Sequence, residues 1–431
     1  MNYYSLNHKA PVVNFKEAAI RGQAPDKGLY FPEKLPVVGQ ELIKNIEATD
    51  EAEIAFRVIK PYVGGTIPDD ALYQIVSETV NFPFPLQQVT DRIAALELFH
   101  GPTLAFKDVG ARFMSRCLGY FLKDEKKHVT VLVATSGDTG GAVASGFYGV
   151  EGVDVVILYP KGRVSPVQEK QLTALGKNIT ALEVNGNFDD CQRLVKQAFI
   201  DADINTKRFL TSANSINVAR WLPQQFYYFF AYKQWPDKKT APVITVPSGN
   251  FGNICAGLLA KITGLPLGHF IAACNANDVV PEFLQTGNWQ PKKAVATLSN
   301  AMDVGDPSNF VRIMQLFDRQ MVKLKDILSA QSISDATTTD TIREVFNTTG
   351  YILDPHGAVA FKAIEHYLSD HKQSKGFILE TAHPVKFPDA VQQATGKEVP
   401  VPEALRSLML QPKHAVAMQP DFEAFKAYLL D

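Results

Sequence analysis

The chain has 431 residues, of which 46% are apolar and 20% are charged, and its formal net charge is −2. This balance is typical of a globular protein with two or three domains. It contains no basic block and no apolar run of the length that spans a bilayer, so we expect neither nucleic acid nor a membrane as a partner.

The chain start lacks the apolar core of a signal peptide, and the four cysteines are widely scattered. We therefore expect a cytoplasmic protein with no bound metal and no disulfide framework. A monomer is the expected state, with a homodimer as the alternative.

The first ninety residues contain several prolines and two segments with helical periodicity, over 51–63 and 70–80. Strand patterns are few in this part of the chain. We therefore predict a separate, mainly helical N-terminal domain over residues 1–93.

From residue 128 onward, apolar runs typical of strands alternate with segments typical of helices. Strands are predicted over 128–135, 154–160, 178–186, 241–250, 269–277 and 375–384, and helices over 140–150, 165–176, 188–199, 218–235, 251–264 and 358–370. Such alternation predicts an α/β fold with parallel sheets and two lobes. We assign 129–215 to a small lobe, and 94–128 with 216–431 to a large lobe. The Ser- and Thr-rich segment 329–341 is predicted to be a surface loop.

The segment PSGNFGN, residues 247–253, joins a predicted strand to a predicted helix. Gly249 and Gly252 allow a tight turn and a close approach to a ligand, and the free N–H groups of the first helical turn would bind an anion. The segment has neither a phosphate-loop lysine nor a GxGxxG pattern, which favours a single phosphate group over a nucleotide. An ordinary strand–helix turn explains this segment equally well by itself.

The segment TSGDTGG, residues 135–141, has the same construction. Hydroxyl groups of Thr135, Ser136 and Thr139 add donors at the helix start, while Asp138 could simply cap the helix. Two anion-binding segments in one α/β chain suggest a phosphorylated cofactor and an anionic substrate that meet between the lobes.

Residues 214–220, NSINVAR, offer a third set of anion ligands. Asn214 and Ser215 supply neutral donors, and the Arg220 guanidinium matches a phosphate or carboxylate. An arginine at a helix start is nevertheless more often a solvated surface residue.

Lys107 stands at the start of a predicted helix over 106–122. An apolar stripe on this helix indicates that it packs inward, and is formed by Val109, Phe113, Cys117 and Tyr120. The positive end of the helix dipole and burial near Phe106 would both disfavour the ammonium form of Lys107. A neutral amine is what a Schiff base with an aldehyde cofactor requires. The alternative is a lysine whose buried stem carries its charge out to solvent.

Taken together, five segments strongly resemble the threonine synthase family. They are HGPTLAFKD at 100–108, ATSGDTGGA at 134–142, SANSIN at 212–217, VPSGNFGN at 246–253 and TAHPVKF at 381–387. The chain start and SNAMDVGDPSN at 299–309 resemble the long microbial and fungal branch, so the likeness runs from end to end. It implies the tryptophan-synthase-β-like fold of pyridoxal 5′-phosphate (PLP) enzymes, fold type II.

The implied activity is that of a carbon–oxygen lyase acting on a phosphate ester. It converts O-phospho-L-homoserine and water to L-threonine and phosphate, the last step of threonine biosynthesis. In the implied mechanism the Lys107 amine removes the Cα proton, phosphate leaves from Cγ, and water adds at Cβ.

The matching motifs also imply the site residues. Lys107 would form the Schiff base with PLP in the large lobe. The further cofactor-binding residues would be Asp138, Gly249, Asn250, Phe251, Gly252, Asn253 and Thr381. For Asp138 the resemblance implies a place beside the cofactor and no particular hydrogen bond, whereas the Thr381 hydroxyl would face the pyridine nitrogen. The substrate-binding residues would be Thr135, Ser136, Gly137, Thr139, Asn214, Ser215 and Arg220.

Two other functions remain open on the sequence. A serine or threonine dehydratase of the same fold needs no site for a substrate phosphate. A catalytically silent relative would be expected to have lost the lysine and the anion-binding segments, and both are intact here.

Overall fold

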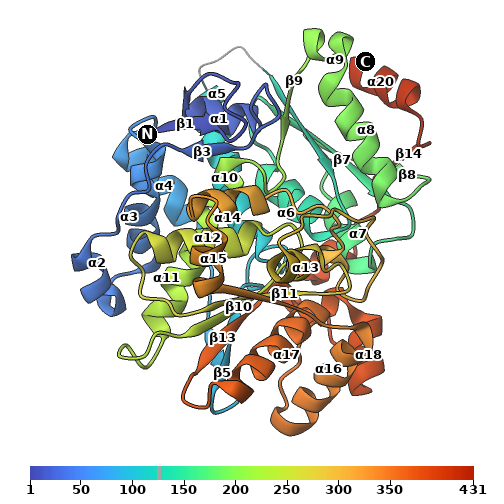
Figure 1. Ribbon diagram of the computed structural model, residues 1–431. Helices are drawn as coiled ribbons and strands as arrows, with labels where there is room; N and C mark the ends of the chain where they lie inside the picture. The colour runs from blue at the N-terminus through green and yellow to red at the C-terminus, as the bar shows by residue number, and fades with distance from the viewer. Residues whose placement is uncertain (124–127) are drawn as a thin grey trace.

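The computed structural model describes residues 1–123 and 128–431. Residues 124–127, which belong to the predicted large-lobe range 94–128, lie outside the described residues. Within the described part, the strands form three sheets of three, six and five strands. Figure 1 shows the two larger sheets as two lobes, with the N-terminal unit at one flank.

The N-terminal unit combines a small antiparallel sheet with helices. Its elements are β1 (Asn2–Ser5), β2 (Val13–Asn14), α1 (Phe15–Arg21), β3 (Tyr30–Pro32), α2 (Gln40–Lys44), η1 (Ile46–Ala48), α3 (Glu51–Val63) and α4 (Asp69–Thr79). Helices α3 and α4 lie where the periodicity placed them. The sheet, ordered β2-β1-β3, was not predicted, because strands of two to four residues are too short to show an alternating pattern.

The larger sheet supplies one half of the site. Its strands are β4 (Leu86–Gln88), β5 (Ile93–Glu97), β10 (Val243–Pro247), β11 (Phe270–Cys274), β12 (Leu328–Ser332) and β13 (Gly376–Glu380), in the order β12-β11-β10-β13-β5-β4. All neighbours are parallel except β4 and β5. The register pairs Glu380 with Glu97, so β13 and β5 end at the same level.

The smaller sheet is entirely parallel. Its strands are β6 (Val129–Ala134), β7 (Val153–Pro160), β8 (Ile179–Val184), β9 (Phe209–Ser212) and β14 (Val416–Met418), in the order β14-β8-β7-β6-β9. Parallel neighbours require crossover connections, which the intervening helices provide. The predicted α/β fold with two lobes is confirmed.

Helices cover both sheets (Figure 1). The helices up to residue 234 are α5 (Lys107–Leu122), α6 (Asp138–Phe147), α7 (Pro166–Thr173), α8 (Phe188–Ile200), α9 (Ala202–Lys207), α10 (Val218–Trp221), η2 (Leu222–Gln224) and α11 (Gln225–Gln234). The later helices are α12 (Gly252–Ile262), α13 (Val279–Thr286), η3 (Asn300–Met302), α14 (Phe310–Leu316), α15 (Met321–Ile327), α16 (Asp335–Thr349), α17 (Pro355–Asp370), η4 (Pro384–Lys386), α18 (Pro388–Thr395), α19 (Glu403–Met409) and α20 (Phe422–Leu430).

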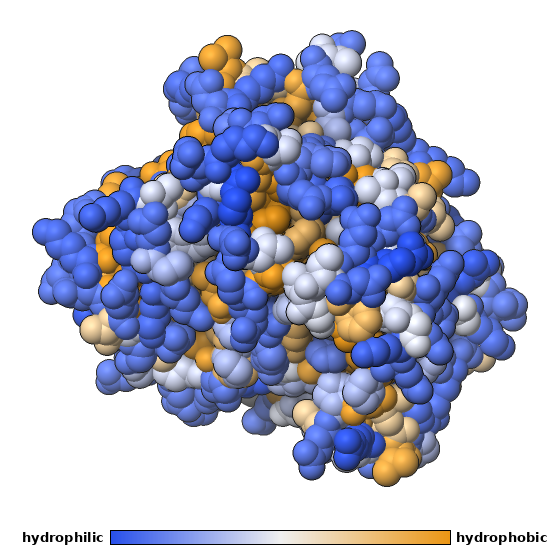
Figure 2. All heavy atoms as spheres, turned by 90° about the horizontal axis from the view of Figure 1, so that it is seen from below, coloured by the Kyte–Doolittle hydropathy of each residue, from blue (hydrophilic) through white to orange (hydrophobic). Residues whose placement is uncertain are grey.

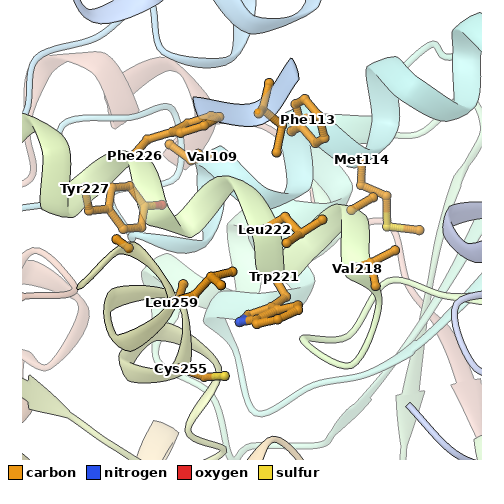
Figure 3. Close-up of a cluster of buried hydrophobic side chains, with 14 of the residues drawn as sticks. Val109, Phe113, Met114, Val218, Trp221, Leu222, Phe226, Tyr227, Cys255 and Leu259 are labelled. Atoms are coloured by element: carbon orange, nitrogen blue, oxygen red, sulfur yellow. The ribbon is translucent and has the colours of Figure 1, made fainter. Parts of the chain in front are cut away.

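A dense apolar cluster anchors the helix that begins at Lys107. Figure 3 shows side chains of α5, α10, η2, α11 and α12 meeting in this cluster, among them Val109, Phe113, Met114, Val218, Trp221, Leu222, Phe226, Tyr227, Cys255 and Leu259. The single helix predicted over 218–235 is interrupted by η2, whose Pro223 lacks the backbone N–H that a continuous helix needs. The predicted stripe on α5 is wrong at Tyr120, which is 39% exposed.

The surface loop predicted over 329–341 is wrong. This segment forms the end of β12 and the first turns of α16, which Ser334 caps by accepting a hydrogen bond from the Thr337 N–H at 3.2 Å. The hydroxyls of Thr338 and Thr341 donate to carbonyls four residues earlier, at 2.9 and 2.7 Å, so these polar side chains can be buried within the fold.

The C-terminal end departs from the predicted large lobe. Strand β14 pairs with β8 in the smaller sheet, and α20 packs beside α8 and α9. In Figure 1, α20 lies next to α8, although the two helices are far apart in the sequence. The range 216–431 is therefore wrong as a purely large-lobe segment, while the remaining domain division stays a prediction.

No helix within residues 1–123 and 128–431 is long and apolar enough to cross a membrane. The face shown in Figure 2 is mostly hydrophilic, with separate smaller hydrophobic areas.

Candidate active site

Five of the segments singled out in the sequence follow the carboxyl ends of parallel strands. The segment that ends at Lys107 follows β5, residues 135–141 follow β6, residues 214–220 follow β9, residues 248–253 follow β10, and Thr381 follows β13. Ligands of open parallel sheets bind at this edge, because the connecting loops there can diverge around a crevice. The parallel direction of the strands therefore places the candidate site residues at the carboxyl edge of each of the two sheets.

The chain before Lys107 is held rigidly. Leu104 adopts a left-handed backbone with φ of 56°, a strained conformation for a branched residue. The Phe106 N–H donates to the Thr381 carbonyl at 2.9 Å, and the Asp108 carboxylate accepts from the N–H and hydroxyl of Thr103 at 2.9 and 2.5 Å. These bonds fix the point at which α5 begins, and that point is Lys107.

The Lys107 amine lies in a largely enclosed place. Its side chain is 15% exposed, and Nζ lies 4.5 Å from the centre of the Phe106 ring and 3.7 Å from Asp138 Oδ2. Burial lowers the pKa of the amine, Asp138 opposes this, and the positive charges of Lys386 and Arg220 lower the pKa further. The direction agrees with the expectation from the sequence, and the largest cause is burial, one of the two causes expected there.

Asp138 is the carboxylate between the lobes. Its Oδ1 accepts hydrogen bonds from Lys386 Nζ at 2.8 Å and from Gln168 Nε2 at 3.0 Å. Burial by itself would raise the pKa of Asp138, but Lys386 and then Lys107 hold it below its usual range. Asp138 therefore forms an ion pair, and a different residue caps α6.

That residue is Thr135. Its Oγ1 accepts from the N–H groups of Gly137 and Gly140, each at 2.9 Å, and the side chain is 1% exposed. Its hydroxyl oxygen thus holds the backbone at the start of α6, while the role of Thr135 as a substrate ligand stays a prediction. Ser136 and Thr139 are half-buried, and Gly137 adopts a φ of 137° that disfavours other residues.

The turn before α12 is shaped for close approach. Phe251, the residue before α12, has a left-handed φ of 59°, and a Cβ on Gly249 would lie 2.6 Å from Met302 Cα. Asn253 accepts a hydrogen bond from Tyr228 at 2.6 Å, while its own Nδ2 is buried without a hydrogen-bond partner among the described residues. An unpaired buried donor beside the free N–H groups of a helix start indicates an anion site.

A polar network joins this turn to residues 214–217. Ser215 Oγ accepts from Asn250 Nδ2 at 2.8 Å and from Asn309 Nδ2 at 3.1 Å. Buried Arg312 donates to Asn309 Oδ1 at 2.7 Å and to the Ile216 carbonyl at 2.6 Å. Neither residue was predicted as part of the site: Asn309 ends the segment 299–309, whose only signal is its resemblance to the family, and Arg312 has no signal in the sequence.

Arg220 is buried instead of solvated. It is 3% exposed, its Nη1 donates to the Ala213 carbonyl, and its Nε has no hydrogen-bond partner among the described residues. Burial lowers the pKa of Arg220 to about 10, so the guanidinium remains charged at neutral pH. Asn214 lies half-buried on the same turn.

Thr381 lies immediately after β13 and is 6% exposed. Its carbonyl binds the backbone next to Lys107, as described above. The residue five positions later, Lys386, is 1% exposed and reaches Asp138 from the other lobe. Lys386 was not predicted as a site residue, and its only signal in the sequence is its place in the segment TAHPVKF.

Comparisons with known proteins agree along the whole chain. Family profiles match it as "Threonine synthase N terminus" over residues 2–80, "Pyridoxal-phosphate dependent enzyme" over 83–379 and "Threonine synthase, C-terminal" over 357–429. The threonine synthase of Haemophilus influenzae is 45% identical over 431 residues, which is 100% of each chain.

Solved structures give the same result. The PLP-bound threonine synthase of Brucella melitensis matches with a TM-score of 0.93 and 37% identity, covering 100% of this chain and 98% of that one. The threonine synthase of Escherichia coli matches with a TM-score of 0.91 and 42% identity, covering 100% and 99%.

Proposed function

The chain belongs to the threonine synthase family of PLP-dependent enzymes, and from this we propose which of its residues carry out the conversion of O-phospho-L-homoserine and water to L-threonine and phosphate. The resemblance in the sequence motifs is confirmed, and so is PLP as the cofactor. One observation carries the placement of the site: the largely enclosed Lys107 amine of one lobe lies 3.7 Å from Asp138 of the other, and the two anion-binding segments begin at the carboxyl edges of the same two sheets.

The residues present fit PLP. The Lys107 amine would hold the aldehyde end, since burial favours the neutral form that can react with it. The phosphate would lie against residues 249–253, where Gly249 and Gly252 leave no side chain in the way and Asn253 Nδ2 has no hydrogen-bond partner in the described part of the chain. The Thr381 hydroxyl would meet the ring nitrogen as a neutral partner.

When bound, PLP supplies an electron sink for negative charge that develops on the carbon skeleton of the substrate. The protein supplies the proton transfers and the positioning. Lys107 is the base for the substrate Cα proton, because burial lowers the pKa of its amine and the side chain is fixed at the start of α5. One amine that serves successive carbons would explain why the sequence motifs contain few other acid–base residues.

The substrate phosphate would be bound by the remaining segments. Ser136 and Thr139 offer hydroxyls at the start of α6, and Asn214 and Ser215 offer donors across the crevice. Arg220 adds a buried positive charge behind residues 213–215, which favours an anion there without direct exposure to solvent. A dehydratase would not require this second anion site, so the substrate phosphate is the feature that separates the two functions.

The test is product analysis with purified protein. Holoenzyme should be yellow and should release phosphate and L-threonine in equal amounts from O-phospho-L-homoserine. Lys107→Ala should lower kcat by at least about a thousandfold, because the base and the covalent anchor are both lost. Phosphate release with 2-oxobutyrate as the only carbon product would overturn the proposal.

A matched control uses a lysine outside the site. Lys426 on α20 pairs with Asp201 and Asp203 at 2.9 and 2.6 Å. Lys426→Ala should leave kcat within about twofold of the unsubstituted enzyme, since the pair is remote from the reacting atoms. An equal loss in both variants would contradict a catalytic role for Lys107.

A further inference from the structure

Lys386 is a buried cation that the proposed reaction does not yet use. Its side chain has no solvent exposure, and it lies in η4, just after β13 of the larger sheet. Val385, its neighbour, packs with Leu104 and Val167 in a small apolar cluster that spans the two lobes. A buried ammonium group is costly unless a carboxylate is paired with it, and here the partner is Asp138.

Asp138 lies between two lysines at unequal distances. Lys386 Nζ donates to Oδ1 at 2.8 Å, which is a charge-assisted hydrogen bond, and Gln168 completes the coordination of this oxygen. Lys107 Nζ lies 3.7 Å from Oδ2, beyond hydrogen-bond distance. The carboxylate is therefore neutralised by Lys386 and leaves the Lys107 amine without a close hydrogen-bonded acceptor on this side.

The consequence of losing Lys386 follows from the burial of the pair. A buried carboxylate without its partner must find another cation or become protonated. The nearest replacement is Lys107, which is already 3.7 Å away. Lys107 would then be held as an ammonium ion and could not attack an aldehyde.

We propose that Lys386 is a positioning residue that neutralises Asp138 and so keeps the Lys107 amine free to react with the aldehyde of the cofactor. This inference rests on the proposed function for the role of Lys107, but it concerns an electrostatic arrangement that exists before any cofactor or substrate binds. It also requires the two lobes to be together, because Lys386 and Asp138 come from different sheets.

The experiment measures the amine directly in the cofactor-free full-length chain. Lysines are acetylated briefly with acetic anhydride at a series of pH values, and the peptide containing Lys107 is quantified by mass spectrometry. The charged groups that act on this amine are Asp138, Lys386, Arg220 and Asp354. With Lys386→Met, the pH at which Lys107 is half-labelled should rise by at least one unit. At any pH below the midpoints of both proteins, the variant then has at least about tenfold less neutral Lys107 amine than the unsubstituted protein.

Three variants make the result specific. Lys386→Arg keeps a positive charge and should retain a midpoint near that of the unsubstituted protein. Lys386→Met combined with Asp138→Asn should return the midpoint to or below its original value, because the competing carboxylate is gone. Lys426→Met, which removes an ion-paired lysine on α20, should leave the midpoint unchanged.

An unchanged midpoint in Lys386→Met, or a raised midpoint that persists in the double variant, would overturn the proposal. If thermal unfolding shows that Lys386→Met does not fold, Lys386→Gln removes the charge while keeping one donor for Asp138, and the same upward shift is expected.

A failed product assay would refute the proposed function without affecting the labelling result, so the two failures can be told apart. PLP affinity at pH 7, measured by fluorescence titration, should fall about tenfold with Lys386→Met and recover as pH rises.

Discussion

Directly before Thr381, Glu380 buries a carboxyl group in the middle of the larger sheet. It has no solvent exposure, and its Oε1 accepts the Asp354 N–H at 2.8 Å, while Oε2 has no hydrogen-bond partner among the described residues. Burial, followed by the negative charges of Asp354 and Glu97, raises the pKa of Glu380 well above its usual value. The folded protein therefore keeps this proton to a higher pH than the unfolded chain does.

This shift predicts a pH-dependent effect of Glu380→Gln. Above the pKa of an ordinary glutamate, the unfolded chain releases the proton that the folded state retains. The native carboxyl group therefore lowers the free energy of unfolding, and this loss increases by up to about 1.4 kcal/mol per pH unit. Glutamine keeps the acceptor for Asp354 and removes this cost. The variant should gain stability relative to the unsubstituted protein from pH 5 to pH 8, as measured by urea unfolding at each pH.

Glu344→Gln provides the control, since the Glu344 side chain is 67% exposed. The difference in free energy of unfolding between Glu344→Gln and the unsubstituted protein should stay constant over the same pH range. A constant difference for Glu380→Gln as well would show that the folded protein does not retain the Glu380 proton.

At the scale of elements, the turn between β10 and α12 depends on the absence of a side chain at Gly249. An added Cβ would lie 2.6 Å from Met302 Cα and 3.0 Å from the Ala301 carbonyl oxygen. Both are backbone atoms, which cannot rotate away, so the turn and residues 300–302 must move apart. Since this turn would receive the cofactor phosphate, the displacement should affect binding as well as stability.

We therefore expect Gly249→Ala to destabilise the protein by about 1–3 kcal/mol and to weaken PLP binding at least tenfold. Differential scanning calorimetry and a fluorescence titration with PLP measure the two effects. Gly39→Ala is the matched control, because Gly39 has a φ of −62° and nothing lies within 4 Å of its added Cβ. It should change stability by less than about 0.5 kcal/mol, and an equal effect at both glycines would contradict the steric argument.

The helices and strands were predictable to different degrees. Helices α3, α5 and α12 show a periodic apolar face or a marked start, and the buried strands of both parallel sheets are continuous apolar runs. Helix α16 was missed because its first turns are rich in Thr, and the hydroxyls that make the sequence look like a loop bond back to the helix itself. Composition alone cannot distinguish these two uses of a hydroxyl.

At the scale of the whole molecule, the chain ends by returning to the smaller lobe. Strand β14 extends the five-stranded sheet, and Phe425 of α20 is fully buried against the apolar cluster of that lobe. Lys413 adds ion pairs to Glu183 and Glu169 at 2.5 and 2.8 Å. The C-terminal residues therefore stabilise the lobe that carries Asp138, although they supply no side chain to the candidate site.

Phe425→Ala should lower the free energy of unfolding by about 3–5 kcal/mol, because it leaves a cavity in a packed core. Its kcat/KM, measured well below the melting temperature, should stay within about twofold of the unsubstituted enzyme. Leu410→Ala removes a side chain that is 86% exposed and should change stability by less than about 0.5 kcal/mol. A large loss of kcat/KM in folded Phe425→Ala would show that α20 also positions the site.

The alternation of strands and helices in the two lobes, the two glycine-containing turns and the lysine at the start of α5 can all be predicted from the sequence. These features are local, since a few neighbouring residues fix backbone conformation, apolar periodicity and the free N–H groups of a helix start. Only the folded chain shows that Lys386 pairs with Asp138, 248 positions away, that Ser215 accepts hydrogen bonds from Asn250 and Asn309, and that β14 completes the smaller sheet. Such pairs depend on how the two lobes pack against each other, and packing over that separation leaves no periodic trace in the chain.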